Sequence, residues 1–410
     1  MRIIQWDNLP MRVLIVCQYY YPENVVIAPI AEELAKRGHE VSVITGLPNY
    51  GYPDILPGYK KMRFETINHV KVYRVKLHPR KTGTVNLVLN YLSFWKNSVS
   101  FIKRFHEDFD LVYSMCLSPI TAISSANVYS KKHNVPHILH CLDLWPESPV
   151  ATGAIKRDSF VYKILFRLSK NIYSKTSRIL ISSPSFESYL RNTIGLKDKD
   201  IRFVPQPPLV MENKAGPIVY DGKFNIVYAG NIGTLQMVEE FVKAVFLLPK
   251  EYKDVQFHII GSGQRLNEVL SLIKRYSLEK KVIYHGLVPS EEVGRYLKGA
   301  ELIFMGLKFE SDSAVSKTIP NKVISDLYFG KPIVASISGD GEKVLASANG
   351  SFFAGGTPEE IETALEEALS SSKGKLEEMG KNNRDYFDKH FSFSKVMDQL
   401  EEEFKDNKKE

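Results

Sequence analysis

The chain has 410 residues, of which 44% are hydrophobic and 25% are charged, and these are the proportions of an ordinary soluble globular protein. Such a length exceeds what one hydrophobic core supports, so it predicts two domains of about 200 residues each. Three cysteines in apolar, strand-like runs argue against a disulfide scaffold, and Cys and His show no metal-ligand spacing. No apolar run reaches the roughly 18 residues that span a bilayer and no signal peptide is visible, so we expect a cytoplasmic protein.

The net charge of +7 is unevenly distributed along the chain. Between residues 55 and 106 there are eleven Lys/Arg against one acid, Glu65, together with eight aromatic residues that include Trp95. A basic, aromatic-rich surface suits an anionic membrane, whereas nucleic-acid binding is disfavoured because no recognition motif is present. A solvated basic face, or aromatics buried in the domain core, remains the alternative.

The first half of the chain alternates strand and helix patterns from Met11 onward, and we expect the first ten residues to be an extension. Apolar runs predict strands and amphipathic runs predict helices. The strands are expected at 11–19, 39–46, 70–77, 110–116 and 136–143, and the helices at 27–38, 87–105 and 119–133. Apolar strands separated by helices indicate a parallel sheet covered on both faces.

The same pattern restarts after a proline-rich stretch at 203–217, which marks a domain boundary. Strands are expected at 224–233, 255–263, 281–286, 301–307 and 332–338, with helices between them and another helix from Pro358. We therefore predict two Rossmann-like domains that face each other, at 11–205 and 218–377. The last segment, 378–404, is helical and charged.

Four loops of the second domain follow its strands, and ligands in open parallel sheets bind beyond the carboxyl ends of strands. The loops are Gly230-Asn231-Ile232-Gly233, Gly261-Ser262-Gly263-Gln264-Arg265, His285-Gly286-Leu287-Val288 and the one before Lys322. Each loop alone is more typical of a tight turn, and Leu266 stands where a dinucleotide fingerprint has its third glycine. Together, with Lys322 and Arg265 as cations, they favour a site for a nucleotide diphosphate.

The stretch IPNKVISDLYFGKP at 319–332 predicts a short helix before a buried strand. Asn321 suits its N-cap, and Gly330 suits the position just after its end. Lys322 then falls in the first turn, where the helix dipole disfavours a cation. A lysine at this place suggests that an anion shares the site, because free N–H groups at helix starts bind phosphates.

Candidate chemistry in the first domain lies in HILHCLDLWPESP at 137–149. Strand alternation puts Asp143 at the open end of its strand, where it could accept a proton or bind sugar hydroxyls, or simply cap a turn. Trp145 would give a rigid aromatic wall, with Glu147 close by. The loop after the first strand, with Glu23 and Asn24, is expected at the same cleft, so these residues are candidates for acceptor binding.

With these residues assembled, the chain resembles the family 4 retaining glycosyltransferases of the GT-B fold, most closely the branch with bacterial fucosamine and colanic-acid fucose transferases. The resemblance runs from Met11 to about Phe404. Its marks are YYPE with LAKRGHEVSVITGLPNY (20–50), DLWPES (143–148), YAGNIG (228–233), IIGSG (259–263), HGLVPSEEV (285–293), PNK with GKPIVAS (320–336) and GTPEEI (356–361).

The resemblance implies donor binding in the second domain and a final segment, 378–404, that packs back on the first. The Asn231–Gly233 and Gly261–Arg265 loops, with Asn321 and Lys322, would hold the diphosphate, and the 285–288 loop would hold the base. No metal or other cofactor is needed in this family, since lysine and helix N-termini offset the charge of the leaving group. Lys322 and Asp143 are thus the expected catalytic residues.

Three departures from the family pattern limit what is carried over. The second glutamate of a paired motif, which binds the donor ribose, would fall at Ser325, and the carboxylate here is the neighbouring Asp326, about 100° round the helix. Leu142 replaces a common histidine, so no histidine base is transferred. NIGTLQMVEE lacks the usual Arg and Lys, which places more of the phosphate contact on Lys322 and Arg265.

These observations predict a retaining transferase that moves a sugar from a nucleotide diphosphate, most simply UDP, to a lipid-linked saccharide in bacterial surface polysaccharide synthesis. The enzyme would lie on the inner face of the cytoplasmic membrane through segment 55–106. A non-hydrolysing nucleotide-sugar epimerase and a non-catalytic sugar-nucleotide-binding or assembly protein are the alternatives. A dehydrogenase is disfavoured because neither half carries the full glycine fingerprint.

Overall fold

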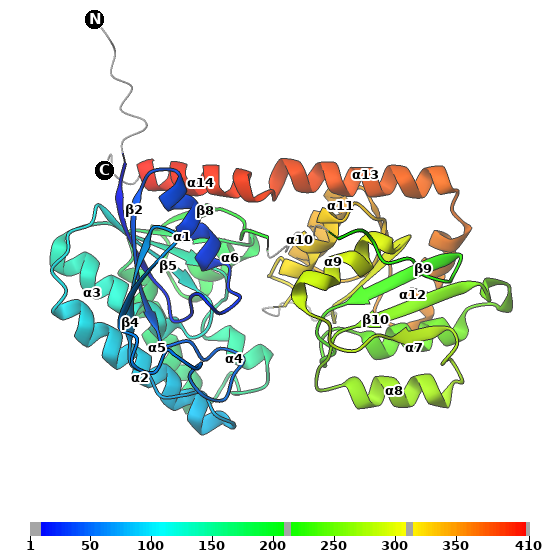
Figure 1. Ribbon diagram of the computed structural model, residues 1–410, viewed down its shortest axis with the longest axis horizontal. Coiled ribbons are helices and arrows are strands. Elements are labelled where there is room, and N and C mark those ends of the chain that lie inside the picture. The colour runs from blue at the N-terminus through cyan, green and yellow to red at the C-terminus, as the bar shows by residue number, and fades with distance from the viewer. Residues whose placement is uncertain (1–9, 209–214, 309–314, 407–410) are drawn as a thin grey trace, which may run out of the picture. The chain divides into compact units, whose positions relative to one another are not determined.

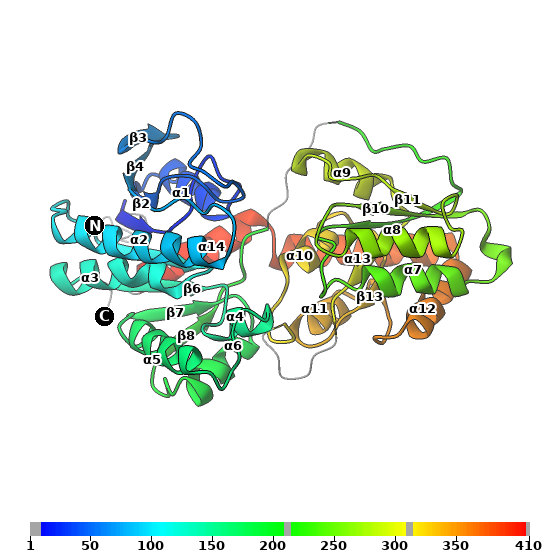
Figure 2. The ribbon, with the colours of Figure 1, turned by 90° about the horizontal axis from the view of Figure 1, so that it is seen from below.

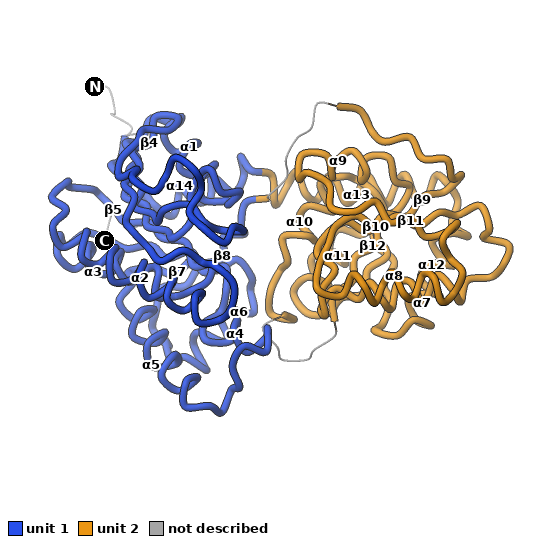
Figure 3. Tube along the Cα trace, turned by 60° about the horizontal axis from the view of Figure 1, so that its bottom comes forward, with its two compact units in different colours: residues 1–207, 393–410 blue, residues 208–392 orange. Residues whose placement is uncertain are grey.

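A computed structural model describes residues 10–208, 215–308 and 315–406. The chain divides into two compact units, residues 1–207 with 393–410, and residues 208–392 (Figure 3). The expected ten-residue extension falls almost wholly outside the described residues. Each unit is an α/β layer structure built on a parallel sheet, which confirms the predicted fold class of two Rossmann-like domains.

Unit 1 contains an eight-stranded sheet in the order β3-β4-β2-β1-β5-β6-β7-β8. All neighbouring strands are parallel except β3 and β4, which pair antiparallel. The strands are β1 (Arg12–Val16), β2 (Glu40–Gly46), β3 (Phe64–Ile67), β4 (Val70–Val75), β5 (Leu111–Cys116), β6 (His137–Cys141), β7 (Arg178–Ile181) and β8 (Asp200–Phe203). Every residue of β5, β6 and β7 is buried, because helices cover both faces.

The helices of unit 1 divide between the two faces of this sheet (Figure 1). They are α1 (Ile27–Lys36), α2 (Thr84–Lys103), α3 (Ser124–His133), α4 (Glu147–Ala151), α5 (Phe160–Ser174), α6 (Ser185–Ser188) and α14 (Phe393–Asp406), with short helical turns η2 (Ile120–Ile123) and η3 (Tyr189–Thr193). Val13 and Ile15 of β1 pack in the same core cluster as α1 and α14. Leu14 and Val16 point to the other face and pack in the same cluster as α2 and α3. This two-residue alternation is what lets one strand serve two cores.

The final helix, α14, belongs to unit 1 although it follows the whole of unit 2 in the sequence (Figure 3). Its apolar face enters the unit 1 core through Val396, Met397, Leu400 and Phe404. The Arg37 guanidinium lies 2.8 Å from the Asp398 carboxylate and 2.9 Å from that of Glu401. The expected terminal segment, 378–404, is thus divided. Helix α14 packs on unit 1, whereas α13 (Lys373–His390) packs against α10 (Asn321–Tyr328) and α11 (Asp340–Ala348) of unit 2.

Unit 2 contains a six-stranded, fully parallel sheet in the order β11-β10-β9-β12-β13-β14. The strands are β9 (Phe224–Ala229), β10 (Val255–Ile260), β11 (Val282–Tyr284), β12 (Leu302–Gly306), β13 (Ile333–Ser336) and β14 (Ser351–Phe353). The other helices are α7 (Val238–Leu247), η4 (Lys250–Tyr252), α8 (Leu266–Arg275), α9 (Ser290–Gly299), α10 (Asn321–Tyr328), α11 (Asp340–Ala348) and α12 (Pro358–Ser370). The strand order reverses between β9 and β12, so these two strand ends flank the switch point where ligands of such sheets bind.

The basic, aromatic segment 55–106 is divided between core and surface. Phe94 and Phe105 are buried, and the guanidinium of Arg74 is enclosed, donating to the Glu65 carboxylate and to the Gly46 and Tyr21 carbonyls. On the outer side of α2, four apolar residues are exposed: Val85, Val88, Leu89 and Leu92. Within the described residues, no helix has both the length and the apolar character needed to cross a bilayer.

Candidate functional site

The loops after β9, β10 and β11 form one layer at the carboxyl edge of the unit 2 sheet. The Gly230 N–H donates to the Ile260 carbonyl at 3.0 Å, and the Gly261 N–H donates to the Gly286 carbonyl at 2.9 Å. Ile232 adds a third link, since its N–H donates to the Ser262 carbonyl at 2.9 Å. These main-chain bonds hold the three loops to one another, so the edge of the sheet presents a connected backbone surface.

The glycines of this layer are required by its own packing. A Cβ placed on Gly261 would lie 1.9 Å from the Gly230 carbonyl oxygen, and one on Gly263 would lie 2.3 Å from that of Ile232. Neither distance is compatible with a side chain. The sequence favoured these glycine loops as part of a diphosphate site, whereas in the structure the neighbouring loop fills the space beside Gly261 and Gly263. Gln264 also links two of these loops, because its amide donates to the Thr234 hydroxyl at 3.1 Å.

Lys322 extends from the first turn of α10 to the switch point between β9 and β12. Its side chain passes Gly230, where a Cβ would lie 3.7 Å from Cδ, and its ammonium is 5.2 Å from the centre of the Tyr228 ring. Lys322 Nζ donates to Asp326 Oδ2 at 2.7 Å. Burial raises the pKa of Asp326, and the adjacent Lys322 charge opposes that rise. The lysine is therefore held at the strand ends by a buried carboxylate one helical turn away.

This pair corrects two interpretations of the α10 sequence. The first-turn lysine has its counter-ion on its own helix, at Asp326, so its presence does not by itself require an anion. The N-cap is Pro320, and Asn321 is the first helical residue; Gly330 follows the helix end with φ +61°, as expected. The Ser325 hydroxyl donates back to the Asn321 carbonyl at 2.7 Å.

Arg265, the second expected phosphate contact, is already ion-paired. Its guanidinium lies 2.7 Å from the Glu239 carboxylate on α7 and 2.9 Å from that of Glu268 on α8, and these partners raise the pKa of Arg265. A cavity of about 290 Å³ adjoins this group and is also lined by Gly233 and Lys308. Two carboxylates offset the charge of Arg265, so the structure supports it less than Lys322 as an anion contact.

The loop after β11 is anchored at one end and open at the other. His285 Nε2 lies 3.0 Å from Nδ1 of His258 on β10, and the His285 ring is half-buried. Gly286 has φ +79° and open space where a Cβ would be, and Leu287 is 78% exposed. Val288 packs against the core cluster that contains α10. His258 was not identified from the sequence, although its place in a strand beside a candidate loop was visible.

In unit 1, Asp143 and Trp145 share a hydrogen-bond partner that the sequence did not reveal. The Ser118 hydroxyl, at the end of β5, donates to Asp143 Oδ2 at 3.1 Å and accepts from Trp145 Nε1 at 3.1 Å. Burial raises the pKa of the Asp143 carboxyl, and the Ser118 hydrogen bond opposes that rise. Asp143 is half-buried at the end of β6, so it lies where the strand pattern predicted.

Trp145 and Glu147, expected to contact an acceptor, lie inside the protein. Trp145 is 7% exposed and packs in a core cluster with α5. The Glu147 carboxylate is 4% exposed and accepts hydrogen bonds from Arg157 at 2.6 Å, Tyr162 at 2.7 Å and Tyr189 at 3.0 Å. Trp145, the expected aromatic wall, is therefore a core residue. Glu147 joins α4 to α5 and η3 through Tyr162 and Tyr189.

Glu23 has a comparable role in the loop after β1, at the same carboxyl edge of the sheet. It is 6% exposed, and its carboxylate accepts from the backbone N–H groups of Tyr20, at 3.0 Å, and Asn49, at 2.6 Å. Burial raises the pKa of Glu23, and these hydrogen bonds oppose the rise. Glu23 thus joins the loops after β1 and β2, and of this pair only Asn24 is exposed.

In comparisons with known proteins, each of the two units matches a family of glycosyltransferase domains. The family described as "Glycosyl transferase 4-like domain" matches residues 23–207, and "Glycosyl transferases group 1" matches residues 211–386. A probable glycosyltransferase, WbjE of Pseudomonas aeruginosa, is 25% identical over 47% of this chain and 49% of its own, so the match spans about half of that relative. The chain is a glycosyltransferase.

Solved structures place this glycosyltransferase in the GT-B fold. Sucrose-phosphate synthase of Thermosynechococcus elongatus superposes with a TM-score of 0.73 at 15% identity, over 97% of this chain and 98% of that one. HepE of Anabaena, solved in complex with UDP, superposes with a TM-score of 0.70 at 14% identity, over 97% and 100%. The resemblance to glycosyltransferases is confirmed at this level, and the fucosamine and colanic-acid branch stays a prediction.

Among the described residues of the glycosyltransferase, no group of three His, Cys, Asp or Glu is placed to hold a metal ion. The predicted donor residues of unit 2 do come together, because the three loops and Lys322 meet at one sheet edge. Of the unit 1 candidates, Asp143 and Asn24 are accessible, while Trp145, Glu147 and Glu23 are buried.

Proposed function

We propose that this glycosyltransferase is a retaining enzyme that transfers a sugar from a nucleotide diphosphate, most simply UDP, to a lipid-linked saccharide. The observation that carries the proposal is the position of Lys322, beside Gly230 at the switch point of the unit 2 sheet. Structures of the neighbour HepE with UDP and with UDP-glucose support a UDP-linked donor.

In the proposed donor site, Lys322 and the N-terminus of α10 neutralise the diphosphate. An ammonium has three N–H donors, and Asp326 takes one, so two remain for phosphate oxygens. Asp326 keeps the ammonium oriented, and the amino end of α10 adds the positive end of its helix dipole. Stabilisation of the leaving group then comes from fixed protein charges in place of a divalent cation.

In the proposed reaction, the departing phosphate oxygen takes the proton of the acceptor hydroxyl as the new bond forms on the same face of the sugar. This route retains the anomeric configuration without a protein nucleophile. Asp143 is assigned to the acceptor, because its carboxylate oxygens are hydrogen-bond acceptors at the end of β6 and Ser118 fixes the orientation of one of them.

The proposed acceptor is lipid-linked, which fits an unusual surface on unit 1. Helices α2, α3 and α5 carry seven Lys/Arg and no Asp or Glu: Lys96, Lys103, Lys131, Lys132, Lys163, Arg167 and Lys170. Apolar side chains are exposed between them, at Val85, Val88, Leu89 and Leu92 on α2 and at Phe160, Val161 and Ile164 on α5. We call the surface formed by these seven cations and the exposed apolar side chains of α2 and α5 the acid-free surface.

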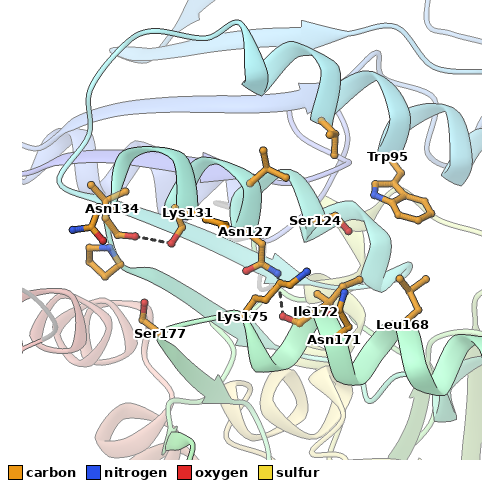
Figure 4. Close-up of a pocket in the computed structure, with 15 residues that line it drawn as sticks. Trp95, Ser124, Asn127, Lys131, Asn134, Leu168, Asn171, Ile172, Lys175 and Ser177 are labelled. Carbon is orange, nitrogen blue, oxygen red and sulfur yellow. Dashed lines mark hydrogen bonds between the residues drawn. The ribbon is translucent and has the colours of Figure 1, made fainter.

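The three helices of the acid-free surface adjoin one another. Figure 2 shows α2 and α3 side by side, and the groove in Figure 4, of about 820 Å³, is lined by Trp95 of α2, Lys131 of α3 and Leu168 of α5. Cations interleaved with exposed apolar groups suit an anionic bilayer, in which the cations meet headgroups and the apolar groups enter the interface. We therefore place the enzyme on the inner face of the cytoplasmic membrane, in surface polysaccharide synthesis, with segment 55–106 contributing α2.

The proposal is tested by ligand binding followed by product analysis. UDP-, GDP- and dTDP-sugars are screened for thermal stabilisation of the purified protein, since a ligand of the folded state raises its apparent stability. A UDP-sugar is expected to give the largest shift, and its sugar is expected to appear on a polyprenyl-diphosphate saccharide with retained anomeric configuration. An altered donor sugar formed without acceptor would indicate the epimerase, and binding without any product would indicate the non-catalytic alternative; the comparisons favour neither.

A further inference from the structure

A line of four hydrogen-bonded side chains crosses unit 2 from the amino end of β12 to the loop after β11. Asn225 Nδ2 donates to Glu301 Oε2 at 2.9 Å, and Asn225 Oδ1 lies 3.1 Å from His258 Nε2. His258 Nδ1 then lies 3.0 Å from His285 Nε2. Asn225 is 3% exposed and His258 is 1% exposed, so water does not compete for the bond between these two side chains.

The orientation of the Asn225 amide determines the direction of every hydrogen bond in this line. The Asn225 amide faces the Glu301 carboxylate at 2.9 Å and the Gly222 carbonyl at 3.0 Å. Both partners accept only, so the NH₂ group must face them and Oδ1 must face His258. His258 Nε2 therefore carries the proton that Oδ1 accepts.

The proton on His258 Nε2 in turn determines which nitrogen of each histidine carries a proton. Burial, together with the neighbouring His285, lowers the pKa of His258 to about 4, so this ring is neutral near pH 7 and has one N–H. With its proton on Nε2, His258 Nδ1 is an acceptor, and His285 Nε2 must be the donor. Burial also lowers the pKa of His285, so His285 is neutral too and its Nδ1 is left as a bare acceptor.

Aromatic packing holds the two rings in this arrangement. Tyr220 stacks on His258 with ring centres 4.1 Å apart, and Tyr296 meets His285 edge-on at 5.0 Å. Nδ1 is the ring nitrogen nearer the main chain, so the bare acceptor of His285 lies on the side of the loop backbone. That loop is joined to the layer that begins beside Lys322, through the Gly261 to Gly286 hydrogen bond.

Lys322 determines which end of a nucleotide would reach this loop. The strand ends run from β12 through β9 and β10 to β11, a distance of about 14 Å for three strand spacings. With the phosphates at Lys322, the base lies at the far end of this edge. We propose that His285 Nδ1 accepts a hydrogen bond from a ring N–H of the donor base, so that the enzyme selects uracil over cytosine.

This assignment rests on the proposed function, and it identifies His285 as the residue that would determine which base of the donor nucleotide is bound. Uracil carries a hydrogen on N3, whereas cytosine N3 is itself an acceptor and would face the His285 lone pair. Two opposed acceptors leave a desolvated polar group unpaired, which lowers affinity by about 10-fold to 100-fold. His285 is the specificity residue, and His258 with Asn225 positions it.

The first test needs no ligand. Long-range ¹H–¹⁵N correlation spectra of the free protein at pH 7.5 report which nitrogen of each imidazole carries the proton. Nε2–H is expected for both His258 and His285. An Nδ1–H signal for His285 would overturn the assignment, and this readout does not depend on any transferase activity.

The second test compares the dissociation constants of UDP, CDP and N3-methyl-UDP by calorimetry. Wild type is expected to bind UDP at least about tenfold more tightly than either of the others. In His285→Phe the preference should fall to near one, and His258→Gln should reduce it in part; His390→Gln, at an exposed site on α13, is the control. Equal preference in wild type and His285→Phe, with UDP still bound, would refute the base contact and leave the proposed function intact. Failure of wild type to bind UDP at all would refute both.

Discussion

Lys322 and Asp326 form the central pair of the candidate donor site. Asp326 is 2% exposed, and its carboxylate depends on the ammonium of Lys322 as its counter-ion. A buried carboxylate left alone is costly, so the two residues are expected to be coupled in stability as well as in function.

Lys322→Ala is expected to lower kcat/KM by about a hundredfold or more, as for other single electrostatic stabilisers of a leaving group. It should also destabilise unit 2 by about 3 kcal/mol, because Asp326 stays buried without its partner. The double variant Lys322→Ala/Asp326→Asn separates these effects, since it should regain stability but no activity. Steady-state kinetics and thermal unfolding measure both, with Lys274→Ala on α8 as the exposed control. A double variant that regains activity would show that Lys322 acts only through folding.

Asp143 offers a second prediction, on pH. Because burial raises its folded-state pKa above the ordinary value, ionised Asp143 costs stability once the pH exceeds the range of an ordinary carboxyl. Asp143→Asn should therefore unfold at an equal or higher Tm than wild type at pH 7, and this advantage should vanish as the pH falls and the wild-type carboxyl is protonated. Activity should fall in the same variant. A lower Tm for Asp143→Asn at pH 7 would show that the carboxylate stabilises the fold.

The sequence placed Lys322 and Asp143 at strand ends but misjudged the side chains around them. The two-residue alternation of side chains along a strand predicts the face of the sheet on which a residue lies. It does not predict which side chains cover that face. Glu147 is buried because Arg157, Tyr162 and Tyr189 surround it, and these partners lie 10 to 42 residues further along the chain. No local pattern predicts such a set of partners.

At the scale of elements, hydrophobic periodicity predicted the order of the strands and helices that it identified. It did not identify β3, β7, β8 and β14, or the helices α4, α5 and α6. The ends of elements were less well predicted: the helix expected at 87–105 is α2, Thr84–Lys103, which begins after Gly83 with φ +89°. The close packing of one loop on another at Gly261 was also not predicted, because a glycine in a sequence does not show whether a ligand or a neighbouring carbonyl fills the space.

The membrane contact proposed for the acid-free surface can be tested by charge reversal. Lys163→Glu/Arg167→Glu/Lys170→Glu on α5 should weaken binding to phosphatidylglycerol-containing vesicles by roughly a hundredfold, at about 1 kcal/mol for each cation lost. Co-sedimentation measures the partition coefficient. The control, Lys274→Glu/Arg275→Glu/Lys280→Glu on unit 2, changes the net charge equally and should bind almost as wild type does. Equal losses in both variants would mean that net charge alone drives adsorption.

At the scale of the whole molecule, two parallel sheets were predictable because the βα pattern stops at a proline-rich stretch and starts again. The division of the terminal helices was not, since α13 and α14 are both charged amphipathic helices. Their separation depends on which core receives their apolar faces: Phe387 of α13 enters unit 2, and Leu400 of α14 enters unit 1.

Leu400→Ala is expected to destabilise unit 1 by about 2–5 kcal/mol, the usual cost of emptying a buried leucine site. If the two units unfold as separate transitions in calorimetry, this variant should lower one of them, and UDP should raise the other. Glu402→Ala, exposed on the same helix, is the control. A UDP-induced shift of the transition that Leu400→Ala lowers would place the nucleotide on unit 1 and contradict the donor assignment.

The path of α14 has a consequence for how the protein is made. Unit 2 is one continuous stretch, 208–392, whereas the core of unit 1 lacks Val396, Met397, Leu400 and Phe404 until the ribosome has delivered them. The lobe that is synthesised first is therefore completed last. While translation continues, the apolar groove awaiting α14 is open to solvent, so nascent chains that stall within unit 2 should be bound by chaperones through their amino-terminal half.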